Sequence, residues 1–106
     1  MHINSDQRRQ LHLAAVLVNN FPNYLYAQAE VLCIEKGLSF ELLKPLLFET
    51  VSKLDQLSPL DAQTGPAVRD DKKTIKEHLK LLEKPHLRSI YKLLTKEIQR
   101  NNGKKL

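Results

Sequence analysis

A histidine and three amides interrupt the most apolar stretch of the sequence, LHLAAVLVNNFPNYLY; they are His12, Asn19, Asn20 and Asn23. An imidazole can transfer protons near neutral pH, and amides can orient a polar ligand. On a regular α-helix, residues seven apart lie about 20° apart, so His12 and Asn19 share a face and Asn20 lies one step further round. Because buried amides need partners, this polar centre is either satisfied by neighbouring protein or open to a ligand.

Pro22 lies in the same stretch and has no backbone N–H to donate. In an α-helix the carbonyl of Val18 would lose its partner, and we expect the helix to kink there. The freed carbonyl would add one more acceptor to the polar centre.

A second candidate site is the segment Thr-Gly-Pro-Ala-Val-Arg-Asp-Asp at residues 64–71. Gly65 and Pro66 predict a bend, and Asp70 or Asp71 is a suitable N-cap for a following helix. Arg69 beside a helix N-terminus could hold a carboxylate or phosphate group of a ligand. The same guanidinium could equally pair with Asp71 or Glu77, so the segment reads as a well-capped loop or as a polar site.

Other catalytic patterns are missing from the sequence. The three glycines, at positions 37, 65 and 103, are too far apart for a phosphate-binding loop, and the four histidines have no metal-ligand spacing, so we expect no metal site. His78 shares a helix face with Ile75 and Leu82, which favours a half-buried structural histidine. The single cysteine, Cys33, lies in an apolar stretch and is typical of a packed thiol in a reducing compartment.

The net charge of +5 is unevenly distributed. Residues 1–71 hold six basic and nine acidic residues, for −3, whereas residues 72–106 hold eleven and three, for +8. Basic residues recur every fourth position at Lys72, Lys76, Lys80, Lys84, Arg88, Lys92, Lys96 and Arg100. No aromatic residues interleave with them to stack on bases, so we expect a solvated face rather than a nucleic-acid site.

Hydrophobic periodicity predicts four helices, over about residues 5–36, 39–57, 71–83 and 85–100, and no strand. The class is therefore all-α, and residues 1–106 are read as one helical domain. Ser5 or Asp6 is the expected cap of the first helix, and Gly37 its stop. Because that helix is apolar nearly all round, we expect it to be largely buried, with a homodimer supplying part of the cover. Polar interruptions and an acidic, polar N-terminus argue against a membrane span or signal peptide, so we expect a cytoplasmic protein.

Two stretches, HLAAVLVNNFPNYLYAQAE (12–30) and TGPAVRDDKKTIKEHLKLL (64–82), resemble the C-terminal helical domain (DUF2520) of Rossmann-like NAD(P)-dependent oxidoreductases. This family is related to the C-terminal domains of 6-phosphogluconate dehydrogenase and of ketopantoate and pyrroline-carboxylate reductases. The resemblance covers roughly residues 8–100. It implies a domain that lines the substrate cleft and supports dimerisation.

By this resemblance His12 and Asn20 would be catalytic, and the substrate-binding residues would be Thr64, Gly65, Pro66, Arg69, Asp71 and His78. Asn19 and Asn23, the other amides of the polar centre, are expected to bind the substrate as well. The family often has glycine where this chain has Asp70, and the added negative charge weakens the case for Arg69 as an anion clamp. NAD(P) would be bound mainly by an N-terminal dinucleotide-binding domain, which this chain lacks, so the chain would be the C-terminal part of a larger protein and bind no cofactor alone. The alternative function is a free-standing helical interaction module.

Overall fold

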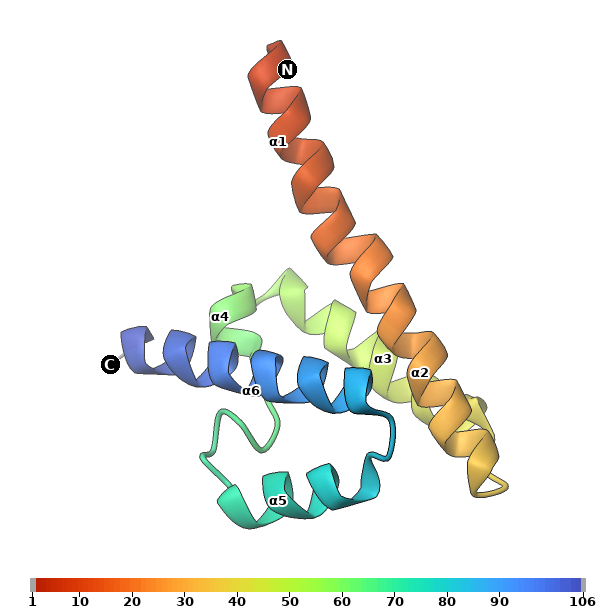
Figure 1. Ribbon diagram of the computed structural model, residues 1–106. Coiled ribbons are helices and arrows are strands. Elements are labelled where there is room, and N and C mark those ends of the chain that lie inside the picture. Colours follow the sequence, from red (N-terminus) through yellow and green to blue (C-terminus); the bar gives the residue numbers. More distant parts are fainter. Residues whose placement is uncertain (1, 106) are drawn as a thin grey trace. The chain divides into compact units, whose positions relative to one another are not determined.

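The computed structural model describes residues 2–105 of the backbone and the side chains of residues 2–102 (Figure 1). Within this range the chain forms helices and no strand, which confirms the all-α class. The chain divides into two compact units, Met1–Phe48 and Glu49–Leu106, and each is described by itself below.

The first unit is built on one long helical rod, made of α1 (Ser5–Ala15), the π turn η1 (Val16–Asn20) and α2 (Phe21–Glu35). Asn4, not Ser5 or Asp6, is the N-cap. Its side chain accepts from the Gln7 N–H at 2.8 Å, and the Gln7 side chain accepts from the Asn4 N–H at 3.0 Å. This reciprocal pair satisfies two otherwise free N–H groups, which is why the helix starts one residue earlier than expected.

The rod ends at the predicted stop, Gly37. Gly37 has a φ of 70°, in the left-handed region that favours glycine. The Gly37 N–H donates to the Ile34 carbonyl at 3.0 Å, and the Leu38 N–H donates to the Cys33 carbonyl at 2.9 Å. These two bonds form the Schellman motif, which satisfies carbonyls at the end of the helix.

The irregularity expected at Pro22 takes the form of a π turn. The Phe21 N–H donates to the Val16 carbonyl, five residues before it, and α2 then starts with Phe21 and Pro22. A turn closed over five residues is wider than an α turn, which gives the proline ring room it would lack against the carbonyl four residues back. Figure 1 shows the ribbon running on from α1 to α2 without a sharp break.

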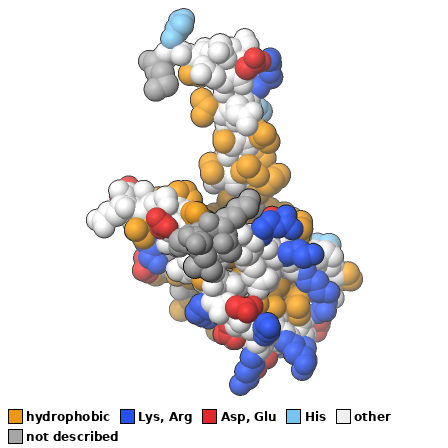
Figure 2. Space-filling model, turned by 90° about the vertical axis from the view of Figure 1, so that its left-hand side faces the viewer, with side chains coloured by type: hydrophobic (Ala, Val, Ile, Leu, Met, Phe, Trp, Pro, Cys, Tyr) orange, Lys and Arg blue, Asp and Glu red, His pale blue; other side chains and the backbone are white. Residues whose placement is uncertain are grey.

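The rod is not buried within the first unit, and the cover expected from a homodimer stays a prediction. Neither α1, η1 nor α2 contains a buried residue, and Leu11, Val18 and Phe21 are 58%, 75% and 57% exposed. Figure 2 shows apolar side chains spread along the surface of the rod. The first unit by itself therefore does not cover the apolar surface of its rod.

The second predicted helix is divided into three segments. Ser39 caps the 3₁₀ helix η2 (Phe40–Leu43) by accepting from the Glu41 N–H at 3.1 Å. α3 (Lys44–Ser52) follows, with Pro45 in its first turn, and η3 (Lys53–Asp55) ends the segment. Proline is tolerated in a first turn because its missing N–H has no helical partner there. Pro45 therefore marks the start of a helix and not a kink within one.

The second unit contains three further helices: α4 (Pro59–Ala62), α5 (Lys72–Leu81) and α6 (Pro85–Lys105). The short α4 was not predicted, and α6 runs five residues beyond its expected end. α5 and α6 form a hairpin, and the most buried side chains of the described chain, Ala67 and Leu87, belong to this unit at 7% and 9% exposure. The core of the unit therefore lies around the turn before α5 and the start of α6.

Candidate functional site

The predicted site residues fall into two groups, one in each unit. His12, Asn19, Asn20 and Asn23 lie on the rod of the first unit, and Thr64, Gly65, Pro66, Arg69, Asp71 and His78 lie in the second. The four side chains on the rod are exposed and form no hydrogen bond with another described residue. They are accessible to a ligand or a partner, so the polar centre is not consumed by contacts within its own unit.

The π turn changes which amide lies in line with His12. A π turn takes up one residue more than an α turn, so the eight residues from His12 to Asn20 rotate the helix as seven would. His12 and Asn20 are consequently about 20° apart around the rod, two turns from each other. Asn19 is displaced from this line, which corrects the α-helical register predicted for His12 and Asn19. The pair best placed to face one ligand is His12 and Asn20.

In the second unit, backbone hydrogen bonds fold the segment 64–71 into a compact turn. The Asp71 N–H donates to the Pro66 carbonyl at 2.9 Å, and the Asp70 N–H donates to the Ala67 carbonyl at 3.2 Å. Gly65 has a φ of 105°, which an L side chain rarely adopts, so glycine is needed at this bend. Because Ala67 is buried, the turn is fixed to the core of its unit.

Asp70 is the described non-glycine residue with positive φ, at 52°. Aspartate tolerates this left-handed conformation better than most residues, and glycine adopts it freely. This backbone requirement accounts for the glycine that the resembling family often has at this position. The side chain of Asp70 accepts from Gln99 Nε2 of α6 at 3.4 Å.

Asp71 is the N-cap of α5, which confirms one of the two predicted caps. Its carboxylate accepts from the Thr74 N–H at 3.1 Å and from the Thr74 hydroxyl at 2.8 Å. These bonds favour the charged form, and the Thr74 hydroxyl, the Thr74 N–H and Arg69 lower the pKa of Asp71 below 3.8. The cap is therefore ionised at neutral pH.

Arg69 reaches back to the cap. Its guanidinium lies 3.6 Å from Asp71 while remaining 61% exposed. This distance is long for a charge-assisted hydrogen bond, and a single exposed contact contributes little to stability. The pair with Asp71, rather than with Glu77, is the one observed, and it leaves most of the Arg69 side chain accessible to solvent.

His78 is tied to the hairpin. Its Nδ1 lies 2.7 Å from the Tyr91 hydroxyl, and the two rings meet edge to face across α5 and α6. Burial raises the pKa of Tyr91 above 10.0. This contact is the satisfied, half-buried arrangement that the helix pattern favoured for His78.

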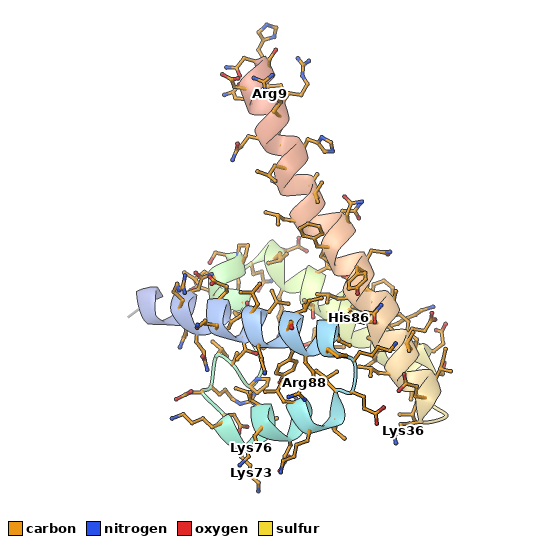
Figure 3. The ribbon with its side chains drawn as sticks, viewed as in Figure 1. Arg9, Lys36, Lys73, Lys76, His86 and Arg88 are labelled. Atoms are coloured by element: carbon orange, nitrogen blue, oxygen red, sulfur yellow. The ribbon has the colours of Figure 1, made fainter. Side chains whose placement is uncertain are left out.

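Arg88 is a structural residue that the sequence analysis missed. Its guanidinium donates to the carbonyls of Leu79 and Leu82, the latter at 3.3 Å, and so satisfies the C-terminal end of α5. Figure 3 shows Arg88 extending from α6 toward α5. The regular spacing of basic residues hid this role, because it placed Arg88 in a solvated row.

In the described part of the chain, no group of three or more histidine, cysteine, aspartate or glutamate residues could hold a metal ion. None of the helices in that part is long and apolar enough to cross a membrane.

These features define an all-α chain with a π-interrupted rod and an arginine-capped helical hairpin. The family described as Domain of unknown function (DUF2520) matches residues 1–98, so the chain belongs to this family. A crystal structure from Bacteroides fragilis, of a protein described as putative NADP oxidoreductase BF3122, is similar to this chain with 42% sequence identity and a TM-score of 0.89. The similarity covers 92% of this chain and 38% of that chain, so this chain spans less than half of that protein's length. No match is found among curated proteins.

Proposed function

We propose that this chain is the dimerisation and substrate-cleft domain of an NAD(P)-dependent oxidoreductase. The observation that carries the proposal is the similarity at 42% identity to part of a protein described as an NADP oxidoreductase. In this proposal residues 1–106 form one helical domain, and a dinucleotide-binding domain of the same polypeptide holds NAD(P) and supplies the hydride chemistry. The whole protein acts in the cytoplasm on a small-molecule substrate.

His12 and Asn20 are proposed to face the substrate from the rod. The in-line placement of the two exposed side chains supports this, with the imidazole moving a proton and the amide orienting a substrate oxygen. Asn19 and Asn23 flank the pair. The turn at Thr64, Gly65 and Pro66, with Arg69, Asp71 and His78, is proposed as a substrate-binding surface of the second unit, where the Arg69 side chain is mostly exposed.

The exposed apolar surface of the rod is proposed to be the dimer interface. Monomeric proteins rarely expose a large contiguous apolar surface, and two copies of a self-complementary helix can cover each other. Sedimentation of the 106-residue chain should show a dimer at micromolar concentration. A monomer at high micromolar concentration would contradict this part of the proposal.

The oxidoreductase assignment is tested with the full-length protein. We expect it to bind NADPH or NADH, measured by quenching of protein fluorescence or by calorimetry, and we expect the 106-residue chain to bind neither. Replacing His12 or Asn20 by alanine in the full-length protein should reduce turnover while leaving cofactor affinity unchanged. A full-length protein that binds no dinucleotide would instead favour the alternative function, a helical interaction module without catalytic activity.

A further inference from the structure

A groove runs along the seam between α5 and α6, entirely within the second unit. It has a volume of about 590 Å³ and is lined by side chains from one face of α5 and one face of α6. Ile75 and Leu79 form its apolar floor, and the lysines along it are Lys72, Lys76 and Lys80 from α5 and Lys92 from α6. We call this groove the lysine groove. Figure 2 shows basic side chains gathered on this unit with apolar atoms between them.

The antiparallel register of the hairpin places lysines on both sides of the floor. Asp70 meets Gln99 at one end, His78 meets Tyr91 near the middle, and Arg88 reaches the carbonyl of Leu79 toward the other end. This register places Lys92 nearly level with Lys76, and both residues line the groove. Lys72, Lys76 and Lys80 follow at four-residue intervals, about 6 Å apart along α5.

The lining of the lysine groove holds more positive than negative charge. None of its four lysines forms an ion pair with a described carboxylate, and Asp70, at one end, is the acidic residue in its lining. Outside the groove five basic side chains pair with carboxylates (Arg9 with Asp6, Lys44 with Glu41, Lys53 with Glu49, Arg69 with Asp71 and Arg100 with Glu97), whereas Lys36, Lys73, Lys84 and Lys96 form no ion pair with a described carboxylate. The accumulated positive charge repels itself in the free protein and would be relieved by an anionic occupant.

The form of the groove indicates which anion fits. Lysines are flexible point charges, and the groove's arginine, Arg88, is engaged with helix carbonyls, so the site lacks the bidentate donors typical of a phosphate site. An apolar seam between two antiparallel helices accepts the apolar stripe of a third helix. Carboxylates four residues apart on that helix would have the same spacing as the lysines on α5.

We propose that the lysine groove is a docking site for an acidic amphipathic helix of a partner protein. The helix would lay leucine-like side chains on Ile75 and Leu79 and present glutamate or aspartate to the four lysines. Such contacts set specificity and association rate, and their strength falls as salt rises. This proposal concerns the second unit alone and does not depend on the oxidoreductase assignment.

The probe is a fluorescein-labelled synthetic peptide of about 14 residues, with glutamates four apart and leucines between them, long enough to span α5. We expect saturable binding to the 106-residue chain by fluorescence anisotropy, and at least about tenfold weaker binding when the glutamates are replaced by glutamine. The double variant Lys76→Glu/Lys92→Glu should weaken binding by at least about tenfold. Lys73→Glu is the matched control, because Lys73 is an exposed lysine of the same helix outside the groove lining, and it should change affinity by less than about threefold.

Exchanging the charges of the groove and the peptide distinguishes a loss of complementarity from a loss of folding. The double glutamate variant should bind a peptide with lysine in place of glutamate better than the unaltered chain does, and circular dichroism should show unchanged helicity for every variant. Four outcomes would overturn the proposal: no binding of the acidic peptide, equal binding of the glutamine peptide, equal weakening by Lys73→Glu, or tighter binding of a short DNA duplex than of the peptide. The last outcome would assign the groove to nucleic acid.

Discussion

The hydroxyl of Tyr91 lies 2.7 Å from Nδ1 of His78, and their rings meet at 89° with centroids 5.8 Å apart. Tyr91→Phe removes the hydrogen bond and retains the ring contact. We expect a loss of about 1 kcal/mol in the free energy of unfolding, measured by urea denaturation. Tyr24→Phe, an exposed tyrosine of the first unit, is the control and should have no effect.

The same tyrosine predicts a dependence of stability on pH. Because burial raises the pKa of Tyr91 in the folded state, the folded chain holds this proton more strongly than the unfolded chain does. The contribution is present below the unfolded pKa of 10.0 and is lost as pH rises through the higher folded pKa. Unfolding free energies measured between pH 9 and pH 11 should therefore fall less in Tyr91→Phe than in the unaltered chain; an identical fall would show that Tyr91 is not responsible.

Removing the Arg88 side chain is expected to destabilise the hairpin. Arg88→Ala leaves the carbonyls of Leu79 and Leu82 without this donor, and we expect a loss of about 2 kcal/mol in unfolding free energy. Arg88→Lys retains the charge without the planar fork and should recover only part of the loss. Lys84→Ala, an exposed lysine before α6, is the control; equal losses for the two alanine variants would contradict a capping role.

Two substitutions at Asp70 distinguish the effect of backbone strain from that of the side chain. At a φ of 52°, Asp70→Ala should destabilise the chain by about 1 kcal/mol, since alanine has no polar group to ease the left-handed conformation. Asp70→Gly should be close to neutral, because relief of strain offsets the larger entropy of the unfolded chain. Thermal unfolding of the two variants provides the measurement. Equal melting temperatures would mean that the conformation at this position is not maintained in solution.

The contribution of the Asp71 cap to stability should decrease at acidic pH. Since Thr74 and Arg69 lower its folded pKa, its contribution to stability is present above the unfolded pKa of about 3.8 and is lost as pH falls through the lower folded value. Asp71→Ala should lower the melting temperature at pH 7. Asp71→Asn can still accept the Thr74 N–H, so it should retain most of the stability but lose this acid dependence, as a melting series between pH 2 and pH 6 would show.

Arg69 should behave in the opposite way to Asp71. Its contact with Asp71 is exposed and monodentate, so Arg69→Ala should leave the melting temperature nearly unchanged. In the full-length protein we expect the same variant to weaken substrate binding, because the accessible guanidinium is proposed to line the cleft. If Arg69→Ala melts the domain and leaves binding intact, the segment 64–71 is only a capped loop.

The parts of the fold that the sequence predicted are those set by local chemistry. Gly37 stops the first helix, Ser39 starts the next segment, and Asp71 caps α5, each through bonds with residues close in the chain. The cap at Asn4 was equally local, since an asparagine followed three residues later by glutamine is a capping-box pattern. α4 is too short to show periodicity, and only the Ser58-Pro59 pair signalled it.

The features that the sequence did not predict depend on geometry beyond a regular period. A π turn has no characteristic pattern of residue types. The sequence therefore predicted that Asn19, and not Asn20, shares a helix face with His12. Arg88 has the spacing of a surface row, yet the hairpin brings it to the end of α5. What covers the rod depends on which surfaces pack together. Hydrophobic periodicity indicates that a helix face is apolar, but it does not identify the surface that packs on that face.

The π turn also determines which changes in chain length the rod can accept. Since η1 holds one residue more than an α-helix needs, deleting a single residue between Val16 and Asn20 would restore the α-helical spacing, but it would also return the Pro22 ring to the carbonyl four residues before it. A deletion within α1 has no such reserve, and it would rotate every residue before it by about 100° relative to α2. The surplus residue is therefore what allows a proline inside a continuous rod.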